Sequence, residues 1–126
     1  MKARETALRL KRFELDEKAR KIADLEQMIR EFDNIASDLD RQIQAEEDRT
    51  GIKDAKHFAY STFAKSAALR RDNLRASTAE LRSKLKVAQE DFDEAKDQLT
   101  RVTSEQPREV TRSRRRPDRP AGLALR

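Results

Sequence analysis

Apolar residues recur along most of this chain at spacings of three and four, which is the pattern of one face of an α-helix. If Leu8 is position a of a seven-residue repeat, the a positions of the first half are Leu8, Leu15, Ile22, Ile29, Ala36 and Ile43. The d positions of the same repeat are Lys11, Lys18, Leu25, Phe32 and Leu39. A second repeat has its d positions at Tyr60, Ala67, Leu74, Leu81, Ala88, Ala95 and Val102. Repeats of this length predict two long helices that pack together as a coiled coil.

The two repeats are separated by the stretch GIKDAKHFAYSTFAKSA, residues 51–67. Gly51 is the only glycine in the first 121 residues, and glycine readily adopts the left-handed conformation that ends many helices. Asp54 can cap the helix that follows, and Ser61 is a second candidate for the same role. We therefore expect a turn between two helices at about residues 48–55.

A chain that folds back at Gly51 and Ile52 brings together residues whose numbers add up to about 103. In that register each a position faces a d position, in the pairs Ile43–Tyr60, Ala36–Ala67, Ile29–Leu74, Ile22–Leu81 and Leu15–Ala88. A shift of one heptad also places a against d. The pattern therefore favours this register without fixing it.

The order of charged blocks indicates how the helices pair. Residues 1–21 have eight basic and four acidic side chains, and residues 87–106 have two basic and six acidic ones. Residues 22–48 have two basic and nine acidic side chains, and residues 53–86 have nine basic and three acidic ones. Antiparallel packing within one chain places a positive block beside a negative block twice, whereas parallel pairing of two copies would align like charges. We predict an all-α, monomeric, antiparallel coiled-coil hairpin over residues 1–106.

Residues 107–126 have a different composition from the rest of the chain. They contain all three prolines, and their seven arginines against two acidic residues account for the whole net charge of +5. Because they show no apolar period, we predict a disordered basic tail. Such a tail can bind nucleic acid or anionic lipid, or it can simply be a solubilising extension, and we favour the extension.

Composition argues against several classes of protein. Charged residues make up 42% of the chain and cysteine is absent, which excludes a disulfide framework and a cysteine-based metal site. The start, MKARETALRLKRF, has no unbroken apolar run, so we expect neither a secretory signal nor a membrane span. We therefore expect a cytosolic protein. His57 is the only histidine, and there is no glycine-rich phosphate loop. We expect a non-enzymatic protein without a metal or cofactor.

Two stretches resemble a known family. They are MKARETALRLKRFELDEKARKIADLEQMI at residues 1–29 and GIKDAKHFAYSTFAKSAALRRDNLR at residues 51–75, and both resemble the flagellar export protein FliJ family in its alphaproteobacterial form. The resemblance covers roughly residues 1–105, is most specific from Gly51 to Arg75, and does not include the arginine-rich tail.

The resemblance implies a fold, a location and partners. Members of the family are antiparallel coiled-coil hairpins in the cytoplasm, peripheral to the inner membrane at the flagellar base, and resemble the rotary stalk of ATP synthases. The implied role is a stalk-like coupler in type III protein export during flagellum biogenesis. Its implied partners are the export ATPase FliI, the export gate protein FlhA and export chaperones. The alternative is an adaptor whose hairpin is a spacer and whose tail binds nucleic acid or an anionic membrane; with the resemblance, nucleic acid is not the expected partner.

Apolar residues that fall outside the seam are the candidates for partner contact. Leu10 and Phe13 are three residues apart on one helical face and are flanked by arginines. We assign the ATPase contact to Arg9, Leu10, Arg12 and Phe13. We assign the export gate contact to residues near the turn, namely Phe58, Phe63, Leu69 and Arg70. For the apolar members of this second group the sequence favours another interpretation, local packing that holds the turn in place.

Polar residues at seam positions give two further expectations. Lys11 and Lys18 occupy d positions that would face Phe92 and Leu85, so the end with both termini should be less tightly packed. Arg71 occupies an a position.

In the predicted register Arg71 faces Phe32, with the acidic residues Glu31 and Asp33 within reach. A polar residue in a coiled-coil seam costs stability and can fix the register. We therefore expect Phe32 and Arg71 to set the register of the hairpin.

Overall fold

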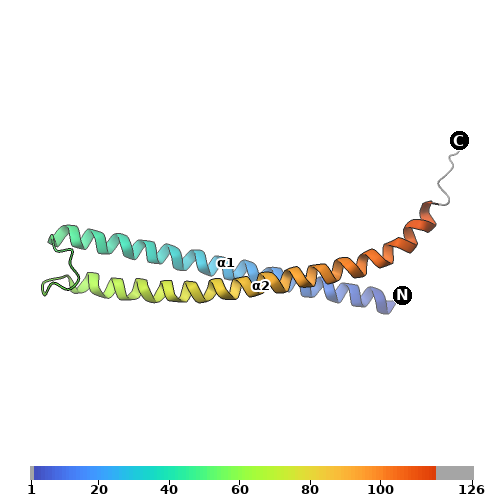
Figure 1. Ribbon diagram of the computed structural model, residues 1–126, viewed down its shortest axis with the longest axis horizontal. Helices are drawn as coiled ribbons and strands as arrows, with labels where there is room; N and C mark the ends of the chain where they lie inside the picture. Colours follow the sequence, from blue (N-terminus) through green and yellow to red (C-terminus); the bar gives the residue numbers. More distant parts are fainter. Residues whose placement is uncertain (1, 116–126) are drawn as a thin grey trace, which may run out of the picture. The chain divides into compact units, whose positions relative to one another are not determined.

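The computed structural model describes the backbone of residues 2–115 and the side chains of residues 2–104. It contains two helices, α1 at Lys2–Thr50 and α2 at Thr62–Arg115, joined by a connection at residues 51–61 (Figure 1). No residue of the described range is in a β-strand. The predicted all-α fold, with two long helices packed antiparallel against each other, is confirmed.

Local sequence explains why α1 is long and where it ends. Its 49 residues include neither glycine nor proline, and Glu5 in the first turn and Arg49 in the last both complement the helix dipole. Gly51 follows with a φ of 76°, in the left-handed region, and its N–H donates to the carbonyl of Glu47 at 2.8 Å. Gly51 therefore closes the helix as the sequence predicts.

The connection is later and longer than the predicted turn at 48–55. Asp54 does not cap α2: its carboxylate accepts from the N–H of Lys56 at 3.0 Å and forms a turn inside the connection. The cap is the second candidate, Ser61, whose hydroxyl accepts from the N–H of Ala64 at 3.2 Å. The connection thus contains an extra turn before α2 begins.

Replacing Ser61 with alanine should destabilise the folded chain. The Ser61 hydroxyl caps α2 and also donates to Glu46 of α1 at 2.7 Å, so its removal affects a cap and a contact between the helices. We expect the free energy of unfolding to fall by about 1–2 kcal/mol, measured by urea denaturation at neutral pH. Ser66→Ala, at an exposed position inside α2, is the matched control. Equal stability of the two variants would show that Ser61 is not the cap.

Contacts divide the described part of the chain into two units, residues 20–89 and residues 2–19 with 90–115. In residues 20–89, the cluster nearest the connection consists of Leu39, Ile43, Tyr60, Ala64 and Ala67, with Leu74 packed against it. A second cluster consists of Leu25, Ile29, Leu81 and Ala88, with Ile22, Phe32 and Leu85 packed against it. Each cluster draws residues from both helices, so the seam holds the core of this unit.

The register of the hairpin differs from the predicted one. Ile29 packs in the cluster of Leu81, whereas its predicted partner Leu74 packs in the cluster nearer the connection. Facing residues therefore have numbers that add up to about 110, one heptad beyond the predicted sum. The cause is the longer connection, because a loop over 51–61 moves the centre of the fold toward residue 56. Two of the predicted pairs, Ile43 with Tyr60 and Ile22 with Leu81, still share a cluster because adjacent layers touch.

Residues 2–19 and 90–104 form a seam whose apolar residues are less buried. Leu8 is buried, and the chain's Leu15, Phe92, Ala95, Leu99 and Val102 are only partly buried. Lys11 and Lys18 are half-buried at their d positions, as expected for lysines whose stems pack on a seam. Both lysines line surface pockets with Ala95 and Gln98. Leu85, the predicted partner of Lys18, packs against the cluster of Leu25 and Leu81. The predicted pairing of Lys11 with Phe92 stays a prediction.

The described helix α2 extends beyond the predicted end of the hairpin. It ends at Arg115, whereas the predicted boundary was residue 106. The side chains of residues 107–126, for which we predict disorder, lie outside the described residues. The backbone is described only as far as residue 115. Disorder of the tail stays a prediction.

Candidate partner-binding surfaces

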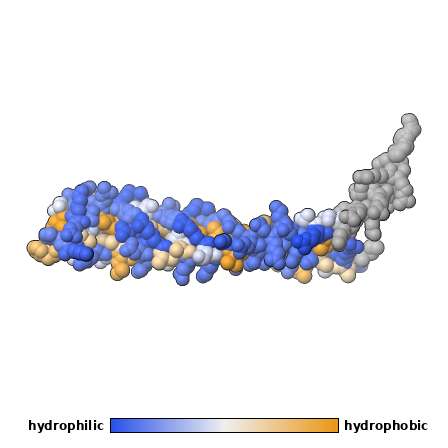
Figure 2. All heavy atoms as spheres, viewed as in Figure 1, coloured by the Kyte–Doolittle hydropathy of each residue, from blue (hydrophilic) through white to orange (hydrophobic). Residues whose placement is uncertain are grey.

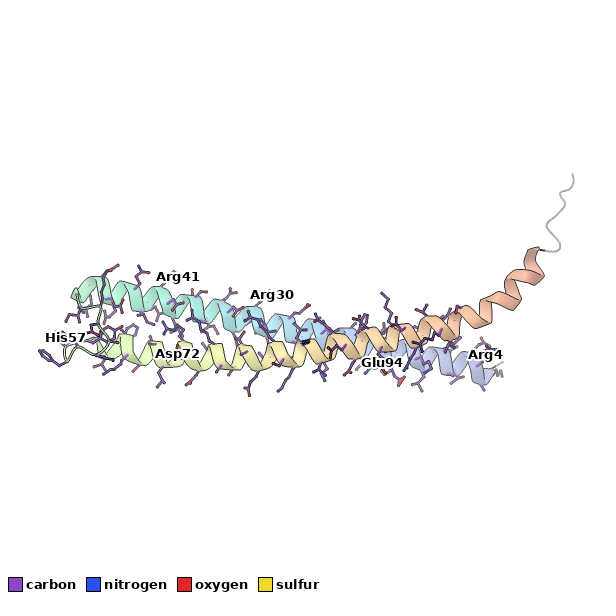
Figure 3. All side chains as sticks on the ribbon, viewed as in Figure 1. Arg4, Arg30, Arg41, His57, Asp72 and Glu94 are labelled. Carbon is purple, nitrogen blue, oxygen red and sulfur yellow. The ribbon has the colours of Figure 1, made fainter. Side chains whose placement is uncertain are left out.

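Most outward side chains of both helices are charged. Figure 2 shows a mainly hydrophilic surface, with apolar atoms gathered near the connection and at intervals along the helices. In Figure 3, Arg30 and Arg41 of α1 extend away from α2, as expected of residues outside the seam. Exposed apolar residues are therefore distinct features of this surface, and they are the candidates for contact with partners.

Leu10 and Phe13 project from the first quarter of α1. Their exposed fractions are 58% and 59%, and the flanking Arg9 and Arg12 are exposed as well. The prediction that the two apolar side chains lie together outside the seam agrees with these exposures. Arg9, Leu10, Arg12 and Phe13 are called the Leu10–Phe13 surface below. Two apolar side chains with a basic border suit an acidic partner surface that offers an apolar recess.

Phe58 lies in the connection and is 96% exposed, stacked on the ring of His57 with the ring centroids 4.7 Å apart. Local packing of Phe58 against the turn, the alternative drawn from the sequence, is therefore wrong. Tyr60 holds the connection instead: it is buried, and its hydroxyl donates to Glu47 at 2.7 Å. The connection thus presents Phe58 on an anchored loop.

The remaining residues assigned to the gate do not form one patch with Phe58. Phe63 is 55% exposed and Leu69 is 65% exposed, and Arg70 is exposed too. Phe63 and Leu69 are six residues apart, so they point about 120° apart around α2. Phe63 and Arg70 are seven apart and share a face. The four predicted gate residues therefore divide between the connection and two faces of α2.

Arg71 has a different partner from the predicted one. Its guanidinium donates to Asp40 at 2.9 Å, while Phe32 packs in the cluster of Ile29 and Leu81. Asp33, predicted to lie near Arg71, pairs with Arg82 at 2.9 Å. This difference follows from the shifted register, which places residues 62–89 of α2 one heptad further along α1 than predicted. Arg71 still reaches across the seam from an a position, with 23% of its side chain exposed.

The carboxylates on this side of α1 have lowered pKa values. The hydrogen bond from Arg71 holds the pKa of Asp40 below its usual value, and the charge of Arg75 adds to the effect. Hydrogen bonds from Arg49 and then Ser61 lower the pKa of Glu46 from 4.5 to about 2. These carboxylates are therefore charged at neutral pH, and the contacts that they accept remain in place.

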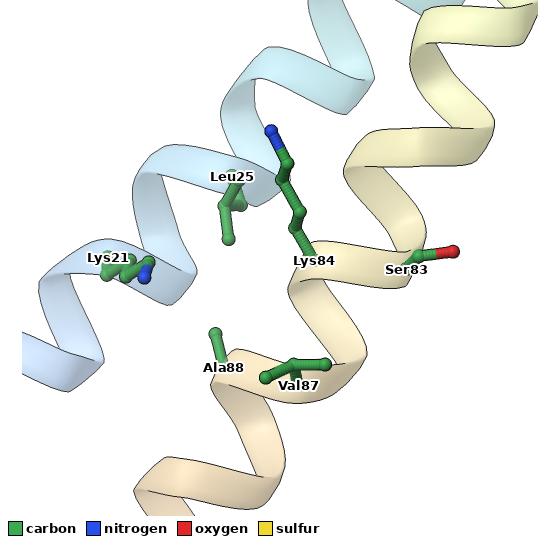
Figure 4. Close-up of a pocket in the computed structure, with 6 residues that line it drawn as sticks. All are labelled: Lys21, Leu25, Ser83, Lys84, Val87 and Ala88. Atoms are coloured by element: carbon green, nitrogen blue, oxygen red, sulfur yellow. The ribbon is translucent and has the colours of Figure 1, made fainter.

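Three exposed apolar residues were missed by the sequence reasoning. Met28 is 41% exposed, Ile35 is 37% exposed and Val87 is 56% exposed. A groove of about 300 Å³ lies beside Val87, lined by Lys21, Leu25, Ser83, Lys84, Val87 and Ala88 (Figure 4). Met28 and Ile35 are seven residues apart, both at position g of the α1 repeat. Apolar residues repeated at position g are the sequence feature that could have indicated this exposed stripe.

Other kinds of site find no support in the described residues. No group of three or more histidine, aspartate or glutamate side chains among them could hold a metal ion. Within the described range, neither helix has a stretch long and apolar enough to cross a membrane. Comparison with protein-family models, curated proteins and solved structures gave no match to this chain.

Proposed function

We propose that this chain is a non-enzymatic coiled-coil component of a flagellar type III protein export apparatus. It would be a stalk-like coupler between the export ATPase ring, the export gate and export chaperones, peripheral to the inner membrane at the flagellar base. The proposal rests on the resemblance of residues 1–29 and 51–75 to the FliJ family.

The structural observation that supports the proposal is the position of the exposed apolar residues on the hairpin. The buried leucines, isoleucines and alanines hold the helices together, while Leu10, Phe13 and Phe58 lie outside the seam with more than half of each side chain exposed. A stalk needs this division, because it must keep its own fold while its outer faces contact several partners.

The surfaces are assigned as follows. The Leu10–Phe13 surface binds the export ATPase. Phe58 of the connection is the main contact for the export gate, because a rigid aromatic side chain on an anchored loop gives contact area at low entropic cost. Phe63, Leu69 and Arg70 are secondary gate contacts, since they do not share one face with Phe58. Phe32 and Arg71 contribute to the seam rather than to a partner.

Binding to purified components tests the proposal. The full chain and a chain lacking residues 107–126 should both bind a purified FliI-type ATPase and the cytoplasmic part of a FlhA-type gate protein, measured by isothermal titration calorimetry. Neither form should bind duplex DNA or anionic vesicles with comparable affinity.

The opposite result identifies the alternative function. Salt-sensitive binding to duplex DNA or anionic vesicles, lost with residues 107–126 and without binding to either export protein, would make the chain an adaptor that acts through its basic tail. The experiment includes this alternative because the seven arginines of that tail can bind polyanions.

A further inference from the structure

The two flanks of the seam in residues 20–89 differ in chemistry. On one flank, carboxylates spaced seven residues apart on α1 meet polar groups of α2. The contacts are Asp33–Arg82 at 2.9 Å, Asp40–Arg71 at 2.9 Å and Glu47–Tyr60 at 2.7 Å. This flank, called the polar flank, is closed by these contacts between the two helices.

The opposite flank has no such contacts in the described range. On α1 it carries Lys21, Met28 and Ile35, again spaced by seven, and none of the three has a polar contact with α2. On α2 it carries Lys84 and Val87. Met28, Ile35 and Val87 are each more than a third exposed, although they border the core. These five residues are called the apolar flank.

Small side chains of α2 open a groove on the apolar flank. Leu25 and Ala88 point toward each other in Figure 4, and the short alanine leaves space beside Val87. Lys21 of α1 and Lys84 of α2 stand on the two sides of this space. Within the described residues neither lysine has an ion-pair partner. The groove is therefore apolar at its floor and positively charged at both sides.

We propose that the apolar flank is the docking site for a third helix, an amphipathic helix of a protein partner with carboxylates beside its apolar stripe. Leucine or isoleucine side chains of that helix would fill the groove over Leu25 and Ala88 and cover Val87. Its carboxylates would pair with Lys21 and Lys84. The nearby acidic residues Asp24 and Glu80 do not line the groove, so they do not put negative charge in it.

The dimensions of the flank fit such a helix. From Lys21 to Ile35 the stripe is about 21 Å long, which corresponds to two heptads of a packed helix. A helix in this place would turn the two-helix coiled coil into a three-helix packing. It would lie along the apolar flank, where no polar contacts join α1 and α2. The inference does not depend on the export function, because it uses only the geometry of residues 20–89.

A pair of designed peptides tests the proposal. The probe is a synthetic 21-residue amphipathic helix, labelled with fluorescein, with leucine at a and d and glutamate at e and g, and its partner peptide has lysine in place of glutamate. Fluorescence anisotropy with the full chain should show binding of the glutamate peptide at least about tenfold tighter than the lysine peptide. The double variant Lys21→Glu/Lys84→Glu should reverse this preference, and Val87→Glu should weaken binding about tenfold or more.

Matched variants separate docking from general attraction between opposite charges. Ala76→Glu introduces the same charge at an exposed residue of α2 that does not line the groove and has no assigned contact, so it should leave binding unchanged. Equal binding of the two peptides, or equal losses with Val87→Glu and Ala76→Glu, would overturn the proposal. A concentration-dependent dimer in sedimentation equilibrium that Val87→Glu abolishes would also overturn it, because the flank would then be occupied by a second copy of the chain. Unchanged helical circular dichroism shows that each variant folds.

Discussion

The double variant Leu10→Ala/Phe13→Ala should lose most of its affinity for the export ATPase while remaining folded. Both side chains are more than half exposed on α1 and do not belong to the seam clusters, so the free energy of unfolding should change by less than about 0.5 kcal/mol. Anchor residues at the centre of an interface contribute about 2 kcal/mol or more, which corresponds to roughly a 30-fold loss of affinity. Calorimetric titration against the purified ATPase and thermal unfolding measure the two effects separately.

A matched variant sharpens this prediction. Leu69→Ala removes an apolar side chain of similar exposure from α2, and it should leave ATPase binding within about twofold of the unchanged chain. Cells that produce the Leu10/Phe13 variant should fail to swim, whereas the Leu69 variant should have at most a weaker effect through the gate. Full ATPase affinity of the double variant would remove this surface from the proposed mechanism.

Cysteines placed at Ile29 and Leu81 should form a disulfide within one chain in nearly every molecule. Both residues are buried in the same cluster, come from opposite helices and have numbers that add up to 110, so we expect their side chains to meet across the seam. The chain contains no other cysteine, so the product is unambiguous. Non-reducing gel mobility and the mass loss of two hydrogens on oxidation measure the yield.

The pair Ile29→Cys/Leu74→Cys is the control, because it corresponds to the register in which facing numbers add up to about 103. It should give little intrachain product, since Leu74 packs against the cluster of Leu39 and Ile43. Efficient crosslinking of this pair and not of the other would show that the shorter turn is the correct one.

The pattern of the chain was sufficient to predict the helices because heptads are local. Each a and d residue reports its own burial, and Leu25, Ile43 and Leu81 are buried as their positions require. The same periodicity placed Leu10 and Phe13 outside the seam. These features depend only on the spacing of residues within one helix, which the sequence contains directly.

The register depends on contacts that spacing does not reveal. Asp54 and Ser61 are both acceptable caps by residue type, and the choice between them sets the length of the connection. It is settled by the hydrogen bonds from Tyr60 to Glu47 and from Ser61 to Glu46, which join residues more than twelve positions apart. The partner of Arg71 follows from this choice, which is why Asp40 replaced Phe32.

The groove on the apolar flank was equally outside the reach of the sequence pattern. Ala88 satisfies the d position as well as leucine does in a binary pattern, yet only a short side chain leaves room beside Val87. Met28 and Ile35 are recognisable in the sequence as apolar g residues. Whether they are exposed and available to a partner depends on the absence of polar contacts across that flank. Such a difference between the two flanks requires coordinates for both helices.

Deleting the gene for this chain in the organism that encodes it tests the central claim most directly. The proposed coupler role predicts cells that do not swim and that export few filament subunits into the medium, measured by immunoblotting of culture supernatants. Expression of the chain lacking residues 107–126 should restore both. Normal swimming and normal export after the deletion would contradict the proposed function.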